Sequence, residues 1–479
     1  MTLKKNVDLN TSIWTLKDAL ASLFVKALSL AIRISGKGSA TSLPGKLALR
    51  WHPHFLKALG KKLPPIRVMM TGTNGKTTTA TFLRDIFEAN HNACLLNEKG
   101  ANLVYGITTS LAQTVAWDGS YQAKIAVIET DEATVGKVAP AVIPSDLVVM
   151  NLFRDQLDRY GELSTTAAFI EEGIPFTTGT IFLNADDPML VGMGRNAEKQ
   201  GLGVFYFGLN VSHDAWDETV TGLAKMVPHP QEVANCPECG QAVLYRSRSF
   251  AHLGDWFCEG CGLKRPDLDA SLTPLQVEAD GWHLRLNHHV LGQGIILKSP
   301  LLGLYNAYNV LAGASVAGHY HTPVTAIQMA LDTHHAMFGR AEKRVIEGKS
   351  VQIMLIKNPA GASEVIKTVC DDKKAHVLIA LNDSYADGED VSWIWDADFE
   401  QLLTMHPNAE RYTVSGKRAY DLANRLQHAT LDTSWHPQVE HSLEEAVHLA
   451  LEGVNEGETL YILPTYTALL ELDTNSHFK

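Results

Sequence analysis

Residues 66–87 encode a strand, a glycine turn and a helix, and this run constrains the fold more than any other part of the chain. Residues 66–70 are largely apolar and predict a buried strand, whereas residues 80–87 carry apolar side chains at helical spacing. Between them lies the segment Gly72-Thr73-Asn74-Gly75-Lys76-Thr77-Thr78. Glycines let backbone N–H groups approach an anion, and a helix N-terminus adds positive potential. The run therefore predicts a phosphate-binding loop in which Lys76 contacts the β- and γ-phosphates and Thr77 binds Mg²⁺.

Length and composition are those of a globular protein with several domains. The chain has 479 residues, enough for two or three domains, of which 45% are hydrophobic and 20% charged. A formal net charge of −12 argues against a general nucleic-acid binder. The best candidate for a membrane span, residues 19–32, is interrupted by Lys26 and is too short. Because no cleavable signal pattern is present either, we expect a cytoplasmic protein.

Residues 1–35 contain one predicted amphipathic helix. One side of it carries Asp18, Ser22, Lys26, Ser29 and Arg33 at helical spacing, and the other side carries leucine, alanine, phenylalanine and isoleucine. We expect the apolar side to pack on the body of the protein. The alternative is a contact with a membrane surface or with a partner.

A second predicted strand, residues 125–128, ends in the acidic run Glu129-Thr130-Asp131-Glu132. Acidic residues at the C-terminal end of a parallel strand face the ligand crevice of such a sheet. A carboxylate in that position can hold Mg²⁺ directly or through water. The run therefore predicts a magnesium ligand, with a solvated acidic turn as the alternative.

Four of the six cysteines have the spacing of a metal site. Cys236 and Cys239 form one C-x-x-C pair, Cys258 and Cys261 form another, and 18 residues lie between the pairs. This spacing is typical of a four-cysteine ribbon, and four thiolates in a tetrahedron suit Zn²⁺. Since no coordination position stays open, the predicted metal is structural, and the pairs indicate metal ligands in a reducing compartment rather than disulfides. Ribbons often bind nucleic acid, but the acidity of the chain favours no nucleic-acid partner.

The phosphate loop resembles the ATP loop of the Mur ligases, which join amino acids to cell-wall precursors through an acyl phosphate. Four further segments carry the resemblance, namely residues 151–161, 184–188, 301–310 and 338–342. The resemblance implies a Mg²⁺ site at Glu129 beside Thr77. The residues that it implies for ATP binding are Gly72, Thr73, Asn74, Gly75, Lys76, Thr77, Thr78, Asn306 and Arg340.

One branch of this family is particularly similar. Residues 154–161 read Arg-Asp-Gln-Leu-Asp-Arg-Tyr-Gly, in which Gln156 replaces a histidine that helps other Mur ligases to bind a second Mg²⁺. That segment is typical of the MurT-type subunits of lipid II isoglutaminyl synthase. The resemblance implies a glutamine-dependent carbon–nitrogen ligase in peptidoglycan biosynthesis. The implied reaction is ATP-dependent amidation of the D-Glu α-carboxylate of the lipid II stem peptide, giving D-isoglutamine through an acyl phosphate.

Ammonia for such a reaction needs a source. Class I glutaminases use a cysteine on a strained elbow flanked by glycines. Outside the two pairs this chain has Cys94 and Cys370, which lack such glycines, and we expect both to be buried as small hydrophobic residues. The resemblance implies a separate glutaminase subunit of the GatD type, which forms a heterodimer with the ligase. It also implies a C-terminal aspartate that orients the partner's histidine, for which Asp390 is favoured over Asp387.

The expected fold is α/β in three parts. Residues 1–60 are expected to form an amphipathic helix and a loop on the ligase domain. Residues 61–343 are expected to form a Mur-ligase-type ATPase domain with a zinc ribbon inserted at about 230–268. Residues 344–479 are expected to form a Rossmann-like α/β domain.

The expected cofactors are ATP, Mg²⁺ and Zn²⁺, and the expected substrate, lipid II, is membrane-borne. The protein is therefore expected in the cytoplasm, with a peripheral contact at the inner face of the membrane as an option. Two other functions stay open: a stand-alone Mur-type amino-acid ligase, and a non-catalytic nucleotide-binding module with a zinc ribbon. Nucleotide hydrolysis that depends on an amine donor separates the ligases from the binding module.

Overall fold

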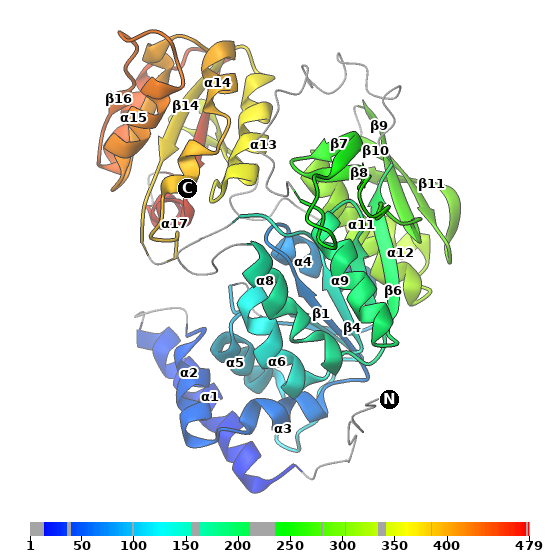
Figure 1. Cartoon of the computed structure of the whole chain (residues 1–479). Helices are drawn as coiled ribbons and strands as arrows, with labels where there is room; N and C mark the ends of the chain where they lie inside the picture. Colours follow the sequence, from blue (N-terminus) through cyan, green and yellow to red (C-terminus); the bar gives the residue numbers. More distant parts are fainter. Residues whose placement is uncertain are drawn as a thin grey trace. The chain divides into compact units, whose positions relative to one another are not determined.

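This computed structural model describes residues 14–35, 40–97, 100–154, 163–210, 235–278, 281–301, 303–333, 342–384, 386–475 and 478. The chain forms two compact units (Figure 1). The first is made of Met1–Leu152, Ser164–Ala215 and Val233–His334, and the second consists mainly of His335–Lys479. Each unit is built around its own sheet, and the expected α/β class is confirmed in both.

The first unit is organised around a nine-stranded sheet in the order β11-β10-β9-β6-β5-β4-β1-β3-β2. From β2 at one end of this order as far as β9, all adjacent strands are parallel to each other. Strands β10 and β11 then extend the sheet from β9 as an antiparallel meander. Both faces of a parallel sheet are covered, which explains why β3 and β4 are buried at every residue. The strand bounds are β1 Ile66–Thr71, β2 Cys94–Leu96, β3 Ile125–Glu129, β4 Asp146–Val149, β5 Thr180–Asn184, β6 Gly203–Leu209, β9 Ala270–Glu278, β10 Gly281–His288 and β11 Gly292–Ser299.

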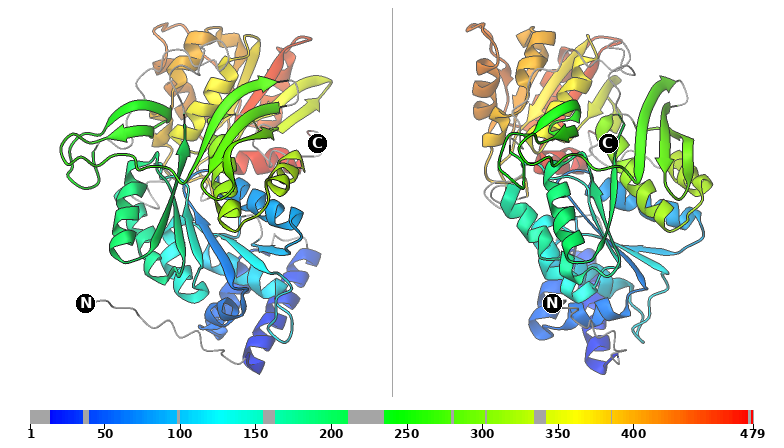
Figure 2. Two further views of the ribbon diagram at one scale, coloured as in Figure 1. Left: turned by 90° about the vertical axis from the view of Figure 1, so that its right-hand side faces the viewer. Right: turned by 45° about the vertical axis from the view of Figure 1, so that its right-hand side comes forward.

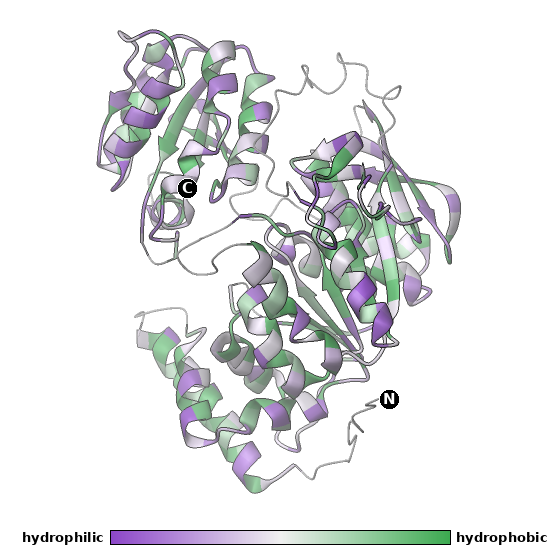
Figure 3. Ribbon diagram, in the orientation of Figure 1, coloured by the Kyte–Doolittle hydropathy of each residue, from purple (hydrophilic) through white to green (hydrophobic). Residues whose placement is uncertain are grey.

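Helices cover this sheet and fix the position of its carboxyl edge. Helix α4 follows β1 and packs against α11 and α12, and α11 is buried along almost its whole length. In Figure 3 the central strands of the sheet are largely green, whereas the strands at its β11 end and the outer helices alternate between green and purple. The helix bounds are α4 Lys76–Ala89, α5 Val104–Thr114, α6 Val135–Val142, α8 Leu163–Glu171, α9 Pro188–Lys199, α11 Leu304–His319 and α12 Val324–Thr333, with short 3₁₀ turns at η1 Glu132–Thr134 and η2 Ile174–Phe176.

Three helices precede the sheet, α1 (Leu16–Ser35), α2 (Leu43–Trp51) and α3 (Phe55–Lys62), where the sequence predicted one. The orientation predicted for α1 is wrong. Its small and polar residues, among them Asp18 and Ser22, are buried, whereas all its leucines except Leu28 are exposed. Small side chains let α1 lie close to α2 and α5, and Asp18 accepts hydrogen bonds from Thr15 and lies 2.8 Å from Nε2 of His52, so its buried carboxylate has partners.

The cysteine segment adds a separate hairpin to the first unit. Strands β7 (Leu244–Phe250) and β8 (Leu253–Phe257) pair only with each other among the described strands, and the hairpin stands beside the large sheet (green in Figure 2). Trp256 fixes its position, because this side chain is fully buried and its indole N–H donates to the Ala185 carbonyl at 3.0 Å, just beyond β5. The insertion therefore rests on the edge of the sheet that also bears the phosphate loop.

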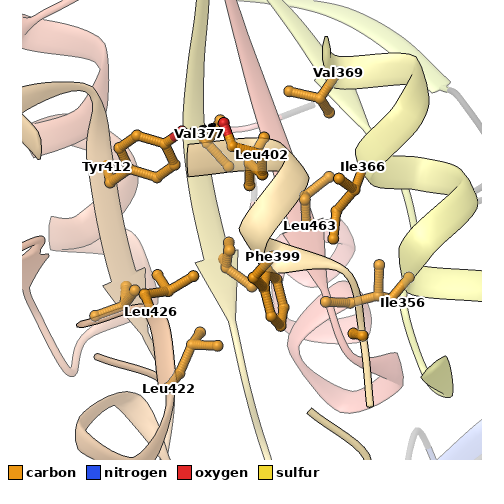
Figure 4. Packing of buried hydrophobic residues seen from close by; sticks show 14 of the residues in the cluster. Ile356, Ile366, Val369, Val377, Phe399, Leu402, Tyr412, Leu422, Leu426 and Leu463 are labelled. Atoms are coloured by element: carbon orange, nitrogen blue, oxygen red, sulfur yellow. Dashed lines mark hydrogen bonds between the residues drawn. The ribbon is translucent and has the colours of Figure 1, made fainter. Parts of the chain in front are cut away.

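The second unit contains a six-stranded sheet in the order β12-β13-β17-β14-β15-β16, in which only β12 is antiparallel among the described strands. Helices α13, α14 and α15 enclose one core, where Phe399, Leu402 and Tyr412 pack together (Figure 4). Helices α16 and α17 enclose the other core. The bounds are β12 Glu342–Ile346, β13 Lys349–Ile353, α13 Pro359–Cys370, β14 Ala375–Ala380, η4 Ser392–Trp395, α14 Phe399–Met405, η5 Ala409–Arg411, β15 Tyr412–Ser415, α15 Ala419–His428, β16 Gln438–Val439, α16 Leu443–Glu452, β17 Thr459–Pro464 and α17 Tyr466–Thr474.

Candidate functional site

The phosphate loop joins β1 to α4 and depends on its two glycines. Gly72 has φ +134° and Gly75 has φ +87°, a region that favours glycine. A Cβ atom on Gly75 would lie 2.0 Å from Oδ1 of Asn309 in α11, so this position also has no room for a side chain. The loop therefore presents backbone at the N-terminus of α4, where N–H groups and the helix dipole favour an anion.

Lys76 and Thr77 point to the acidic run that follows β3. Met70 in β1 is paired with Glu129 in β3, which brings the end of β3 beside the loop. The Nζ atom of Lys76 lies 3.0 Å from Oε2 of Glu132, and the Thr77 hydroxyl donates to Oε1 of Glu129 at 2.9 Å. Both carboxylates are nearly buried. A carboxylate and a hydroxyl that meet here are the hard oxygen ligands that Mg²⁺ prefers, so the residues fit this ion.

Asn97 and Asn151 hold the loop and the acidic run in place. The Asn97 side chain accepts from the Glu129 backbone N–H at 2.8 Å and donates to the Glu129 carbonyl at 3.0 Å. Asn151, at the end of β4, accepts from the Asn74 N–H at 2.9 Å and donates to the Asn74 carbonyl at 3.1 Å. The sequence did not predict these two supports or the Lys76–Glu132 pair, because its only signal for them is a polar residue at each strand end.

Helix α11 supplies one asparagine to the loop and a second beside it. Oδ1 of Asn309 accepts from the Thr79 hydroxyl at 3.3 Å, and its side-chain amide donates to Oδ1 of Asn306 at 3.2 Å. The predicted ATP residue Asn306 thus lies one hydrogen bond away from the residue that touches the loop. Arg340, the predicted cation for the polyphosphate, lies outside the described residues, as does the segment 155–161 with Gln156.

The four paired cysteines converge at the open end of the β7–β8 hairpin, with two before β7 and two after β8. Their sulfur atoms all lie within 4.8 Å of one another, with Sγ–Sγ distances of 3.6 Å for Cys236–Cys261 and 3.4 Å for Cys239–Cys258. Tetrahedral Zn²⁺ with Zn–S bonds of about 2.3 Å needs sulfurs about 3.8 Å apart, so the cluster fits that ion. Backbone N–H groups aimed at the sulfur, foremost that of Cys261, lower the pKa of Cys258 to about 7, whereas burial raises the pKa of Cys236 to about 12.

A buried polar network connects the cysteine insertion to the main sheet. Asp186, at the end of β5, makes an ion pair with Arg265 at 2.7 Å and accepts from the Tyr308 hydroxyl of α11 at 2.6 Å. It also accepts from the Leu209 backbone N–H at 2.8 Å. Burial raises the pKa of Asp186, whereas Arg265 opposes that shift. The insertion is therefore joined to the same helix that carries Asn309.

In the second unit, the carboxylate of Asp387 is held by hydrogen bonds from neighbouring residues of the same unit. It is buried, and its carboxylate accepts hydrogen bonds from the Ser384 N–H at 3.2 Å, the Thr467 N–H at 2.7 Å and the Thr467 hydroxyl at 2.5 Å. These contacts tie the segment after β14 to the first turn of α17. A carboxylate engaged by three neighbouring donors within its own unit is poorly placed to meet a histidine from another chain.

Asp390 has a different environment. It is half-buried and accepts a hydrogen bond from the Ser392 N–H at 2.8 Å, at the start of η4. It lines a groove of about 280 Å³ together with Trp395, Arg418 and Asp421. Trp395 is 50% exposed beside it. Residues Ser392–Trp395 form the single 3₁₀ turn η4, so Asp390, just before it, and Trp395 line the same groove.

The remaining cysteines are poor nucleophiles in this structure. Burial raises the pKa of the Cys94 thiol and of the Cys370 thiol to about 12 in each case. A thiol with such a pKa stays protonated at neutral pH, and the thiolate is the nucleophile. Among the described helices, moreover, none combines the length and the hydrophobicity needed to cross a bilayer.

Comparison with known proteins identifies the class of this protein. Residues 70–228 match the Mur ligase middle domain and residues 355–469 match the MurT ligase C-terminal domain. In the solved structures, MurF from Acinetobacter baumannii superimposes with a TM-score of 0.62 at 14% identity, covering 90% of this chain and 79% of that one. A pseudomurein peptide ligase type C from Methanothermus fervidus gives 0.61 at 20% identity, covering 86% and 78%. Fold and phosphate loop together define a ligase of the Mur type, a class that uses ATP and Mg²⁺.

Sequence relatives narrow this class. The chain is 35% identical to the MurT subunit of lipid II isoglutaminyl synthase (glutamine-hydrolyzing) from Streptococcus pneumoniae, over 95% of this chain and 96% of the relative. It is 32% identical to the subunit of the same name from Staphylococcus aureus strain COL, over 92% and 93%. The chain therefore belongs to the MurT family of Mur ligases, as the sequence motifs predicted.

Proposed function

We propose that this protein amidates the D-Glu α-carboxylate of the lipid II stem peptide to D-isoglutamine, with ATP as the energy source and ammonia from a partner glutaminase of the GatD type. The observation that carries the proposal is the convergence of Lys76, Thr77, Glu129 and Asn309 on one phosphate loop, in a chain whose relatives are named as subunits of that synthase. The name "subunit" itself supports a second chain in the enzyme.

The proposed reaction has two steps. A carboxylate oxygen of the substrate attacks the γ-phosphorus of ATP, the bond from that phosphorus to the bridging oxygen breaks, and ADP leaves. The nitrogen of ammonia then attacks the carbonyl carbon of the acyl phosphate, loses a proton, and expels inorganic phosphate. The products are the primary amide, ADP and phosphate, and no oxidant or reductant is required.

The phosphate-loop residues suit the first step. Phosphoryl transfer depends on positioning and on neutralising charge rather than on covalent chemistry by the protein. Lys76 supplies a cation beside the transferring group, and the backbone of residues 72–78 surrounds the polyphosphate. Bound Mg²⁺ supplies further positive charge, and Thr77 and Glu129 are the residues proposed to hold it. Arg340 is proposed as a further cation, on the basis of the sequence motif alone.

The second step needs ammonia, and the thiols of Cys94 and Cys370 suit no glutaminase. Their high pKa and the absence of a glycine-flanked elbow support delivery from a separate subunit. We assign to Asp390 the role of orienting the partner's histidine, because its carboxylate lines an open groove whereas that of Asp387 is engaged within its own unit.

The domain limits and the ribbon metal belong to the same proposal. Residues 1–60 are assigned to a helical layer on the ligase domain, residues 61–343 to the ATP-binding domain and residues 344–479 to the C-terminal domain. The four-cysteine cluster is proposed to bind one Zn²⁺ as a structural ion, because four protein ligands leave no position for a substrate.

Co-purification with a candidate glutaminase, followed by an amidation assay on lipid II, tests the proposal. The expected result is a stable heterodimer that converts lipid II in the presence of ATP, Mg²⁺ and glutamine, with one ADP formed per amide. ATP-dependent addition of an amino acid instead of ammonia would identify a stand-alone Mur-type ligase. Nucleotide binding without turnover under any amine donor would identify a non-catalytic module.

A further inference from the structure

Helix α1 presents a continuous apolar face away from the body of the first unit. Its exposed residues recur at intervals of three and four positions, which places them along one side of the helix. Exposed fractions of the large ones range from 40% for Phe24 to 78% for Ile34. The face consists of Leu16, Leu20, Leu23, Phe24, Ala27, Leu30, Ala31 and Ile34.

The opposite face of α1 fixes this orientation. Asp18 accepts from the Thr15 N–H at 2.8 Å and lies 2.8 Å from Nε2 of His52, just beyond α2. Lys26 donates to the Val115 carbonyl at 2.5 Å, at the end of α5. Ser22 and Ser29 are buried on the same side of the helix. Rotation of α1 to bury its leucines would break these contacts and leave Asp18 without a comparable partner. The fold therefore directs the apolar face of α1 outward.

The charge around α1 is opposite to the charge of the chain as a whole. The first 64 residues contain eleven lysines and arginines but two acidic residues, whereas the whole chain has a net charge of −12. One of those two acidic residues is Asp18, which is buried against His52. The described basic residues that are exposed on the three helices include Lys17, Lys46, Arg50, Lys57 and Lys61.

We propose that α1 binds the surface of an anionic phospholipid membrane, with its leucines and Phe24 inserted at the level of the headgroups. A helix of 20 residues is about 30 Å long, and an apolar face flanked by lysine and arginine is the pattern of helices that lie in the interface. Two copies of this basic surface repel each other, which disfavours a symmetric dimer as its occupant.

Anionic lipids attract the exposed lysines and arginines, and this electrostatic attraction adds to the burial of the apolar face. The inference stands on the helix and its charge alone. The substrate of the proposed function is carried on a lipid, so a ligase bound to the bilayer would encounter that substrate by diffusion along the membrane surface. Vesicles without substrate therefore test it independently of amidation.

Sedimentation of the full chain with vesicles measures the proposed contact. Vesicles of phosphatidylglycerol and phosphatidylcholine should bind the protein, vesicles of phosphatidylcholine alone should bind it weakly, and added salt should weaken binding. The double variant Leu23→Gln/Phe24→Gln should lower the partition coefficient at least tenfold. The variant Met329→Gln/Leu431→Gln is the matched control, because it removes apolar side chains that are also exposed elsewhere.

Three results would overturn the proposal. The first is the absence of binding to the anionic vesicles, and the second is binding that the α1 double variant leaves unchanged. The third is a dimer in lipid-free solution that the same variant dissociates, which would assign the face to a second copy of the chain. If the unmodified protein bound the anionic vesicles but did not amidate lipid II, the result would count against the proposed function and would still support the membrane contact.

Discussion

At the scale of single residues, the lysine of the phosphate loop is paired with a carboxylate of the same chain. Lys76 lies 3.0 Å from Glu132, and both side chains are largely withdrawn from solvent. Removing one partner of a buried pair leaves the other charge uncompensated. If Lys76 contacts the phosphates as proposed, ATP replaces the Glu132 carboxylate as the partner of Lys76, and this pair is then part of the site.

Lys76→Ala should abolish ATP turnover while the fold persists. Loss of a cation at the transferring phosphoryl group costs about 10³-fold or more in rate. Steady-state ADP release measures the effect, and circular dichroism checks the fold. Lys199→Ala, on the exposed end of α9, is the control and should retain full turnover. Near-normal amidation by Lys76→Ala would remove this loop from the mechanism.

Asp390 and Asp387 should separate by their response to free ammonium. Asp390→Asn should leave ATP binding unchanged, lower glutamine-dependent amidation at least a hundredfold, and regain activity with concentrated ammonium. Asp387→Asn should instead destabilise the second unit, because its carboxylate accepts from Ser384 and from both donors of Thr467.

Parallel assays with glutamine and with ammonium, together with thermal unfolding, distinguish the two aspartates. An equal loss with both nitrogen sources would place Asp390 in the synthetase site. A selective loss in a stable Asp387→Asn variant would transfer the role to Asp387.

At the scale of elements, the cysteine insertion has two distinct parts. One is the cysteine cluster, and the other is the set of contacts that attaches the insertion to the main sheet. The sulfurs meet at the open end of the β7–β8 hairpin, while Trp256 and Arg265 contact the residues just after β5. Asp186 and Tyr308 of α11 connect this attachment to the ligase domain without any contact to the sulfurs that an ion would bind.

The protein should contain one Zn²⁺ per chain, and Cys236→Ser/Cys258→Ser should lose it. Elemental analysis measures the metal, and hydrogen exchange should show faster exchange in β7 and β8 of the variant. ATP turnover should decrease less than tenfold, since the ion has no open coordination position. Cys94→Ser is the control and should keep its zinc. Zinc retained by the double variant would exclude this cluster as the site.

Sequence reasoning succeeded where the signal was local and failed where packing decided. The phosphate loop, the cysteine pairs and the parallel strands each depend on residues close together in the chain, and the structure brings them together as expected. The orientation of α1 was missed because it depends on His52 and Val115, which lie far from the helix in sequence. Likewise, Asp387 differs from Asp390 in its contacts with Thr467, which lies 80 residues away in sequence.

At the scale of the whole molecule, the two units should respond differently to nucleotide. A Mg²⁺ complex of a non-hydrolysable ATP analogue at about 100 times its Kd stabilises the state that binds it by about 2.7 kcal/mol. Hydrogen exchange should therefore slow in β1, β3 and α4 of the first unit and stay unchanged in β14 of the second. In the Lys76→Ala variant the nucleotide analogue should not slow exchange in β1, β3 or α4. Slowing confined to β14 would contradict the proposed position of the nucleotide in the first unit.

The contact between the Thr79 hydroxyl and Asn309 spans 230 residues of sequence. A ribosome that adds about 5–20 residues per second reaches Asn309 roughly 10–50 s after it has made Thr79. Throughout that interval the glycine turn lacks the helix that closes against it at Gly75. Fragments that stop before residue 304 lack α11, and we expect them to bind ATP more weakly than the full chain.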